Sequence, residues 1–365
     1  MKLHPVHTAS DINVFISLSR LIYKDNACYR RSNEDIVELL IKNKTAFKTH
    51  ADVRPYLIKT DSTVVGRFAL IRDNLNSDLV MVAFFEAMPK LQNLSDEIVN
   101  LAKKLFPQGK KICIGLDGHL NYGAGLLLGK YDEMPSYGLP YTLPYYPDYF
   151  RDFKLNRLFT FQFPITNVEH FHDTSLFRNK GITVRKINRK TLFEEIKIYT
   201  ELNNKSFNNH IFWTKRNVEE DYEVFSSFRH LIKNENLLFA EYKGEPIGFL
   251  LWFPDFNQML DSDRLLKINT PFSPDVLRYK YFNTIKKIRL AEIAVVPEFH
   301  HKLVDLLLLK RMFSEAYAQG YRLCEGGFIS ETNQNSINLT SRYIERITNV
   351  KVEPYRTYGV FEKAL

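Results

Sequence analysis

The chain has 365 residues, more than one hydrophobic core usually organises, so we expect two domains of about 180 residues each. Apolar residues make up 45% and charged residues 25% of it, with 15 Gly and 15 Pro, which excludes a disordered, low-complexity or collagen-like chain. Lys and Arg exceed Asp and Glu by 50 to 42, and this modest, dispersed excess favours a solvated basic surface over a nucleic-acid footprint.

The number and spacing of the cysteine and histidine residues argue against a disulfide-linked or metal-binding structure. Cys28, Cys113 and Cys324 are far apart and odd in number, so they build neither a disulfide framework nor a paired metal knuckle. His170 and His172 have Asp173 beside them but no further ligand group nearby, and we predict no metal. The sequence has no apolar run of about 18 residues, and its first residues do not resemble a secretory signal peptide. It therefore predicts a cytoplasmic protein without a membrane partner.

The first half predicts an alternation of helices and strands. Helical periodicity covers Ser10–Tyr23 and Ser32–Lys42, and residues 56–76 predict a β-hairpin around the polar turn Thr60-Asp61-Ser62. The other elements predicted in this half are a strand at 79–87, a helix at Ser95–Phe106, a strand at 111–117 and a Tyr- and Pro-rich segment at 137–149.

The second half repeats this order at an offset of 182 residues. Residues 238–257 predict a second hairpin, and its second strand opens with Ile247-Gly248 where the first has Val65-Gly66. Periodicity is lost over Pro164–Gly181, which predicts domains at 1–170 and 180–365. The matching elements are helices at Lys190–Asn204 and Val218–Lys233, a strand at 288–296, a helix at Lys302–Gln319 and a strand at 322–329.

Short motifs run in a fixed order over nearly the whole chain. They are Tyr23-Lys24-Asp25, Val65-Gly66-Arg67, Phe84-Phe85-Glu86, the block 115–146, Gly248, 254–257, 296–299, Glu331-Thr332-Asn333 and 355–358. This order resembles bacterial tandem proteins of the GCN5-related N-acetyltransferase (GNAT) superfamily, which are mostly uncharacterised and labelled N-acetyltransferase-like. The resemblance implies an α/β fold with a mixed (α+β) sheet in two tandem GNAT-like domains, the N-terminal one degenerate.

The resemblance also implies a site for an acyl donor, acetyl-CoA or another acyl-CoA. In the superfamily an Arg/Gln-x-x-Gly-x-Gly/Ala loop after the fourth strand binds the pyrophosphate through backbone N–H groups. Here His300 takes the basic position, while Leu303 and Asp305 replace the two small residues. An Asp in a first helical turn stabilises the helix by roughly 0.3–1 kcal/mol and repels a phosphate. Ordinary CoA binding and a degenerate or different donor site both stay open; the donor residues would be Val295, Val296, His300, His301 and Lys302.

Two residues are candidates for proton transfer in the C-terminal half. A carboxylate on strand four is a common base in the superfamily, and Glu292 is the only one within that predicted strand; a paired structural Glu is the alternative reading. The usual acid is a Tyr about seven residues after an Asn, but counting from Asn333 that position is Thr340. Tyr343, one helical turn further on, is the candidate replacement, with a core or surface Tyr as the alternative.

Substrate residues are expected at strand ends and in the Tyr/Pro run. Glu331 and Asn333 lie where an open α/β sheet binds substrates. Asp255 follows the second hairpin and either approaches substrate or caps a turn. The run 137–149 brings Tyr141, Tyr145 and Tyr146 to a cleft between the domains or to a packing loop.

Together these features predict an N-acyltransferase that moves an acyl group from a CoA thioester, or another acyl carrier, to an amine of a small molecule or peptide. An aminoacyl-tRNA-dependent peptidyl transferase-like enzyme is one alternative, because the basic charge and the missing Gly loop fit it. A non-catalytic binding protein is the other. Outside the tRNA alternative, we expect no nucleic-acid partner.

Overall fold

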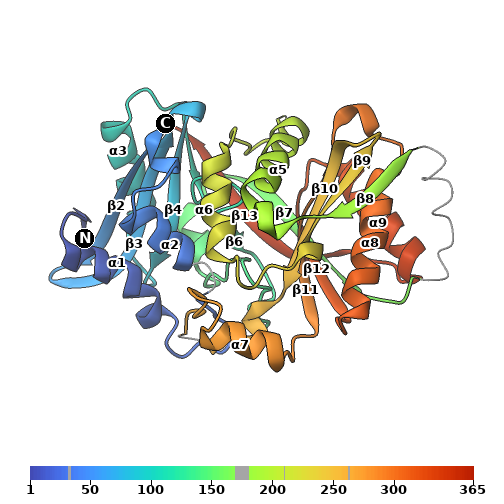
Figure 1. Ribbon diagram of the computed structural model, residues 1–365. Helices are drawn as coiled ribbons and strands as arrows, with labels where there is room; N and C mark the ends of the chain where they lie inside the picture. The colour runs from blue at the N-terminus through green and yellow to red at the C-terminus, as the bar shows by residue number, and fades with distance from the viewer. Residues whose placement is uncertain (32–33, 169–180, 209, 262–263) are drawn as a thin grey trace. The chain divides into compact units, whose positions relative to one another are not determined.

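The computed structural model describes residues 1–31, 34–168, 181–208, 210–261 and 264–365. They form two compact units (Figure 1). Unit 1 comprises Met1–Leu158, Leu260–Leu265 and Arg356–Leu365, and unit 2 comprises Phe159–Met259 and Leu266–Tyr355. The chain therefore returns to unit 1 at its C-terminal end, which the internal repeat does not predict; the predicted boundaries at 170 and 180 stay a prediction.

Unit 1 is a sheet with helices on both faces. The helices are α1 (Ala9–Ile22), α2 (Glu34–Lys42) and α3 (Leu94–Leu105). The sheet order is β1 (Lys2–Pro5), β2 (Ala51–Thr60), β3 (Thr63–Asp73), β4 (Leu79–Ala87), β5 (Lys111–Ile114) and β13 (Pro354–Ala364), with β6 (Leu126–Leu127) paired to β13. Neighbours are antiparallel except β4 and β5, which are parallel.

Alternation along β3 decides which face each helix covers. Phe68 points into the core that Ile98 and Ala102 of α3 complete, and all three side chains are buried. The next side chain back, Arg67, points to the other face, where it donates to the carbonyl oxygen of Phe15 in α1 at 2.6 Å. A polar side chain thus lies buried beneath α1, on the face opposite the apolar core.

β4 and β5 separate beyond their shared hydrogen bonds. Their parallel register ends at Val82 and Ile114, while β4 continues to Ala87. Gly115 ends β5 with φ of +84°, in the left-handed region that favours glycine, so the predicted strand 111–117 is three residues too long. The two strand ends leave a gap in the hydrogen-bond ladder, and the site described below lies there.

Unit 2 has the same arrangement. Its helices are α5 (Leu192–Phe207), α6 (Val218–Ser227), α7 (Pro274–Tyr281), α8 (Val304–Ala318) and α9 (Gln334–Thr348). Its sheet order is the second part of β7 (Lys154–Pro164), β12 (Leu323–Ser330), β11 (Lys287–Val295), β10 (Glu245–Pro254), β9 (Leu237–Tyr242) and β8 (Ile182–Lys186). β11 and β12 are parallel, and their register ends at Leu290 and Gly326.

The tandem α/β class with mixed sheets is confirmed, and the predicted elements occur in order in both halves. One glycine in each hairpin shows why the repeat is visible in the sequence. A Cβ on Gly66 would lie 2.6 Å from the Glu86 carbonyl oxygen, and one on Gly248 would lie 2.8 Å from that of Ala294. Only glycine fits either place. The predicted helix Val218–Lys233 is too long, because α6 ends at Ser227.

Candidate functional site

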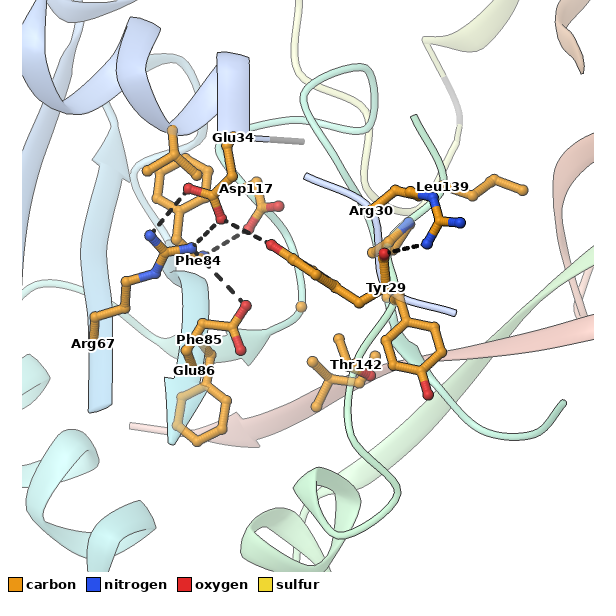
Figure 2. Close-up of a pocket in the computed structure, with 16 residues that line it drawn as sticks. Tyr29, Arg30, Glu34, Arg67, Phe84, Phe85, Glu86, Asp117, Leu139 and Thr142 are labelled. Carbon is orange, nitrogen blue, oxygen red and sulfur yellow. Dashed lines mark hydrogen bonds and ion pairs between the residues drawn. The ribbon is translucent and has the colours of Figure 1, made fainter. Parts of the chain in front are cut away.

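A cavity of about 70 Å³ lies in unit 1 at the gap between β4 and β5. Five charged side chains line it. Figure 2 shows Glu34, Arg67, Glu86 and Asp117 turned toward one another, while Arg30 lies apart from them and donates to the Tyr29 carbonyl oxygen at 2.7 Å. Two carboxyl groups from the strand ends, one from α2 and one guanidinium thus share a small space. Backbone and side chains of the segment 139–142 complete the wall.

Arg67 is the cation of this cluster and is 2% exposed. It donates from Nη2 to Glu34 Oε1 at 2.7 Å and from Nη1 to Glu34 Oε2 at 3.2 Å, a two-pronged pair with the first residue of α2. Its ring neighbour is Phe15, whose centroid lies 5.2 Å from the guanidinium carbon. Tyr29 also donates to Glu34, at 3.3 Å. Glu34 is thereby committed to Arg67 and Tyr29.

Glu86, on β4, is less strongly paired. The nearest Arg67 nitrogen is 3.9 Å from its Oε1, while Oε2 accepts hydrogen bonds from Tyr23 at 2.7 Å and Tyr146 at 2.6 Å. Burial raises the pKa of Glu86 to about 7, against the lowering effects of Arg67 and the two hydroxyls. Both protonation states are therefore accessible near neutral pH. Burial, followed by the Glu86 charge, raises the pKa of Tyr23 and of Tyr146 well above the usual value.

Asp117 lines the same cavity from the loop after β5. Its Oδ1 accepts the Phe84 N–H at 2.8 Å, and Phe84 holds φ of +54°, a bulge conformation that turns this N–H away from the ladder. Burial raises the pKa of Asp117 to about 7, while the Phe84 N–H and Arg67 oppose the rise. A Cβ on Gly123 would lie 2.5 Å from Asp117 Oδ2, so the Gly-rich loop packs its backbone directly on this carboxyl.

The Tyr/Pro run closes over the end of β4. Tyr146 accepts the Ala87 N–H at 3.2 Å, and Tyr145 donates to the Ala87 carbonyl oxygen at 2.9 Å. Tyr141, which lines the cavity, donates to the Tyr131 carbonyl oxygen at 2.7 Å. These hydrogen bonds all lie within unit 1. Of the three predicted substrate tyrosines, the structure thus brings Tyr146 to Glu86, Tyr145 to the next residue and Tyr141 to the cavity wall, all in the half that the sequence assigns as degenerate.

Glu292 occupies β11 of unit 2, beyond the last hydrogen-bonded pair with β12. It is half-buried, and its Oε2 accepts the Tyr199 hydroxyl at 2.8 Å. Burial and the Glu292 charge raise the Tyr199 pKa, and the Arg216 guanidinium carbon lies 5.4 Å from the Tyr199 ring centroid. Arg216 in turn pairs with Asp221 of α6. A Tyr–Glu pair at the strand gap thus occurs in unit 2 as well.

The predicted donor loop precedes α8. His301 and Leu303 hold φ of +63° and +59°, so two non-glycine residues keep the left-handed conformation that glycine favours. His300 Nε2 lies 3.0 Å from the Val295 carbonyl oxygen, and the Lys302 ammonium lies 4.2 Å from the Phe299 ring centroid. Val296 donates its N–H to the Ile247 carbonyl oxygen.

Tyr343 lies against the start of α8, where its hydroxyl bonds the Asp305 carboxyl. Burial, followed by the Asp305 charge, raises the Tyr343 pKa to about 12, and burial raises the pKa of Asp305. The structure thus brings together the predicted acid and the residue predicted to oppose phosphate binding.

The other predicted substrate residues make local contacts. Asp255 is 1% exposed and accepts the Asn257 N–H at 3.2 Å, which is the turn-capping geometry. Asn333 accepts the Ser336 N–H at 3.1 Å as the N-cap of α9. The Glu331 carbonyl oxygen accepts from the Gln334 side chain in the same turn.

Glu34, Arg67, Glu86 and Asp117 are site residues that the sequence reasoning did not select. Arg67, Glu86 and Asp117 lie within the motifs that carry the family resemblance, and Glu34 does not. Glu86 had a further signal, because it stands on strand four of the first half, as Glu292 stands on that of the second. Within residues 1–31, 34–168, 181–208, 210–261 and 264–365, no group of three His, Cys, Asp or Glu could hold a metal ion, and no helix is long and apolar enough to cross a membrane. His170, His172 and Asp173 lie outside these ranges.

No protein-family model matches the chain. A protein of Caulobacter vibrioides named bacterial ceramide synthase is 22% identical over 384 residues, covering 99% of this chain and 97% of that one. A tandem GNAT protein from the clavulanic acid biosynthesis pathway superposes with a TM-score of 0.54 at 11% identity, over 100% of this chain and 98% of its own. The GCN5-related glucosamine N-acetyltransferase region of a fungal multi-domain β-N-acetylglucosaminidase gives 0.58 at 10% identity, over 99% of this chain and 38% of that protein.

Proposed function

We propose that this chain, which has the fold of tandem GCN5-related N-acetyltransferases, is an N-acyltransferase whose catalytic base is Glu86. One observation carries the proposal: a buried carboxyl with a pKa of about 7 lies at the gap between two parallel strands, beside a cavity, and two tyrosine hydroxyls hold it. A base with a pKa near the working pH is the most effective proton acceptor.

In the proposed reaction, the amine nitrogen attacks the carbonyl carbon of a CoA thioester. The new C–N bond forms as ionised Glu86 takes a proton from the amine, and the C–S bond then breaks. The departing thiolate recovers that proton from Glu86 through the hydroxyl of Tyr146 or Tyr23, each within 2.7 Å of Glu86 Oε2. The proton balance closes without a covalent intermediate. The strongly raised pKa values of both tyrosines suit hydroxyls that relay a proton and stay neutral.

For the acceptor, we propose the amine of a long-chain base. The support is the full-length relative named bacterial ceramide synthase, because a ceramide is an N-acylated long-chain amino alcohol. A cavity of about 70 Å³ has room for an amine head group, since a water molecule takes up about 30 Å³, and the alkyl chain would stay outside it. Asp117, which lines the same cavity, would hold the arriving neutral amine by a hydrogen bond.

A second arrangement places the same reaction in unit 2, with Glu292 as base and Tyr343 as acid. The hydrogen bond from Tyr199 to Glu292 favours it. In that arrangement Val295, Val296, His300, His301 and Lys302 bind acyl-CoA, and Asp255, Glu331 and Asn333 contact the acceptor. The left-handed loop at His301 and Leu303 supports a phosphate site there, although glycine is absent.

The test compares Glu86→Gln with Glu292→Gln, after circular dichroism has shown that each variant is folded. Thiol release is measured with palmitoyl-CoA and acetyl-CoA as donors, and with sphinganine and a short diamine as acceptors. We expect Glu86→Gln to lose about 10²- to 10⁴-fold in kcat/KM and Glu292→Gln to stay within a few-fold of the parent. The parent rate should rise with pH through about 7, because the base must be ionised.

The reverse pattern would assign the reaction to unit 2. Full turnover by both variants would refute an essential carboxylate base. If the parent releases no thiol with any acceptor, the chain is not an acyl-CoA transferase of this kind, and an assay with aminoacyl-tRNA or ligand binding addresses the alternatives.

A further inference from the structure

The segment between β10 and β11 of unit 2 exposes aromatic side chains that nothing in the described chain covers. Phe272 is 80% exposed, Phe282 74% and Tyr281 63%, and Leu277 of α7 is 36% exposed. In unit 1 the corresponding link, between Asp73 and Leu79, contains a single 3-10 turn (Asn74–Asn76) and no α-helix. The α7 segment is therefore an addition to the elements that the two halves share.

The inner face of α7 holds the segment firmly. Tyr279 is 5% exposed, and its hydroxyl lies 3.2 Å from that of Tyr321. Asp275 is 1% exposed and accepts the Lys267 N–H at 2.7 Å. Arg278 donates to the Met259 carbonyl oxygen at 3.1 Å. Because one face is anchored by buried contacts, the exposed aromatics belong to a fixed outer face.

The exposed charged side chains between Leu266 and Lys286 are of one sign. From Leu266 to Lys286 the sequence contains four cations and one acid, and the acid is the buried Asp275. The four cations are exposed: Lys267, Arg278, Lys280 and Lys286. The Lys280 ammonium lies 5.1 Å from the Tyr281 ring centroid, so charge and ring occupy the same patch. We name Lys267, Phe272, Leu277, Lys280, Tyr281, Phe282 and Lys286 the α7 face; Arg278 is left out because its side chain anchors α7 to Met259.

We propose that the α7 face docks the protein onto an anionic lipid bilayer. Exposed aromatic side chains with cations beside them fit the interface of such a bilayer. There, aromatic side chains lie at the level of the head groups, and Lys and Arg contact anionic lipids. A second copy of the chain fits poorly, because a two-fold contact would bring like charges together. Surface docking needs no membrane-spanning helix, and it does not depend on which carboxylate is catalytic.

Vesicle sedimentation with the full chain tests this without any activity assay. We expect the parent to bind phosphatidylcholine vesicles that contain phosphatidylglycerol, and to bind pure phosphatidylcholine much more weakly. Replacing Phe272 and Phe282 by Ser should lower the partition coefficient at least about tenfold per ring. Lys280→Glu with Lys286→Glu should lower it at least about 25-fold, since each cation contributes about fivefold.

Matched control variants distinguish binding through the α7 face from nonspecific adsorption of the protein to vesicles. Phe193→Ser removes another exposed aromatic, 42% exposed on α5, and Lys103→Glu with Lys104→Glu makes the same charge change on α3. Both should bind as the parent does. Phe282→Trp should show an emission shift to the blue on anionic vesicles that Phe193→Trp lacks, which reports insertion even if a Ser variant fails to fold.

Three results would overturn the proposal. The first is no binding of the parent to anionic vesicles, and the second is unchanged binding by the Phe272 and Phe282 variant. The third is a partner of another class: parent dimers in sedimentation velocity that the Phe variant abolishes would assign the α7 face to a second copy, and RNA that competes fully with vesicles would assign it to nucleic acid.

Discussion

The carboxyl groups of unit 1 predict that its stability falls as pH rises from 5 to 8. Burial gives Glu86 a folded pKa of about 7 against an ordinary value of 4.5. A group with a raised folded pKa stabilises the fold most below its unfolded pKa, and that contribution is lost as pH rises through the folded pKa. At 1.36 kcal/mol per unit, Glu86 alone accounts for about 3 kcal/mol between pH 4.5 and 7.

Asp117 acts in the same direction, because burial raises its pKa from 3.8 to about 7. For a domain of this size a change of 1 kcal/mol shifts the midpoint by about 2–4 °C, so titrating Glu86 alone should lower the melting temperature of unit 1 by roughly 6–12 °C. Scanning calorimetry at pH 5, 6, 7 and 8 measures this, since it separates the transitions of two units that circular dichroism would merge.

Glu86→Gln is the decisive variant in this experiment. The amide removes the titrating group and keeps its shape, so the pH slope of the unit 1 transition should become markedly shallower. Glu97→Gln, which removes an exposed carboxylate from the first turn of α3, should leave the slope unchanged. A parent midpoint that stays flat or rises between pH 5 and 8, or an unaltered slope in Glu86→Gln, would refute the reasoning.

Three further substitutions test the packing of the two units. Arg67→Met leaves two buried carboxylates without their cation and should lower the free energy of unfolding by about 3–5 kcal/mol in urea titration; a loss below 1 kcal/mol would contradict a structural ion pair. Gly66→Ala places a Cβ 2.6 Å from a carbonyl oxygen and should cost about 1–3 kcal/mol, whereas Gly129→Ala, with open space around it, should be neutral. Tyr199→Phe removes the hydrogen bond to Glu292 and should cost about 0.5–1.5 kcal/mol; no change in the urea midpoint would show that this hydroxyl is equally well solvated in the unfolded chain.

The order of elements was predictable because its signals are local. Helical periodicity and turn residues are each defined within a few consecutive residues, and the correspondence of Gly66 with Gly248 follows from aligning two such short segments. The ends of elements were less predictable, since they depend on single backbone angles: β5 stops at Gly115, where φ turns positive. α7 was missed because the segment from Pro254 to Lys287 has no counterpart in the first half to be aligned with.

The unit 1 cluster was not predictable because its members are distant in sequence. Arg67 and Glu34 are 33 residues apart, and Tyr146 and Glu86 are 60 apart. The raised pKa of Glu86 comes from burial by these segments, which no window of sequence contains. The prediction favoured Glu292 because it is the only carboxylate within the predicted fourth strand of the C-terminal half, the half that the resemblance does not mark as degenerate.

The Tyr/Pro run and the Glu86 cluster are parts of one site, and this constrains how a donor could enter unit 1. Tyr145 donates to the carbonyl oxygen of Ala87, and Tyr146 accepts from the N–H of the same residue. Tyr149 donates to the carbonyl oxygen of Met88. In the reaction proposed for unit 1, an extended thioester arm would pair with these backbone groups at the strand gap. Exchanging one hydrogen bond for another costs little net free energy. A thioester arm could therefore displace the tyrosine hydroxyls from these backbone groups more readily than it could displace a buried apolar side chain. An arm that displaced Tyr146 from Ala87 would leave its hydroxyl on Glu86, where the proposed proton relay requires it.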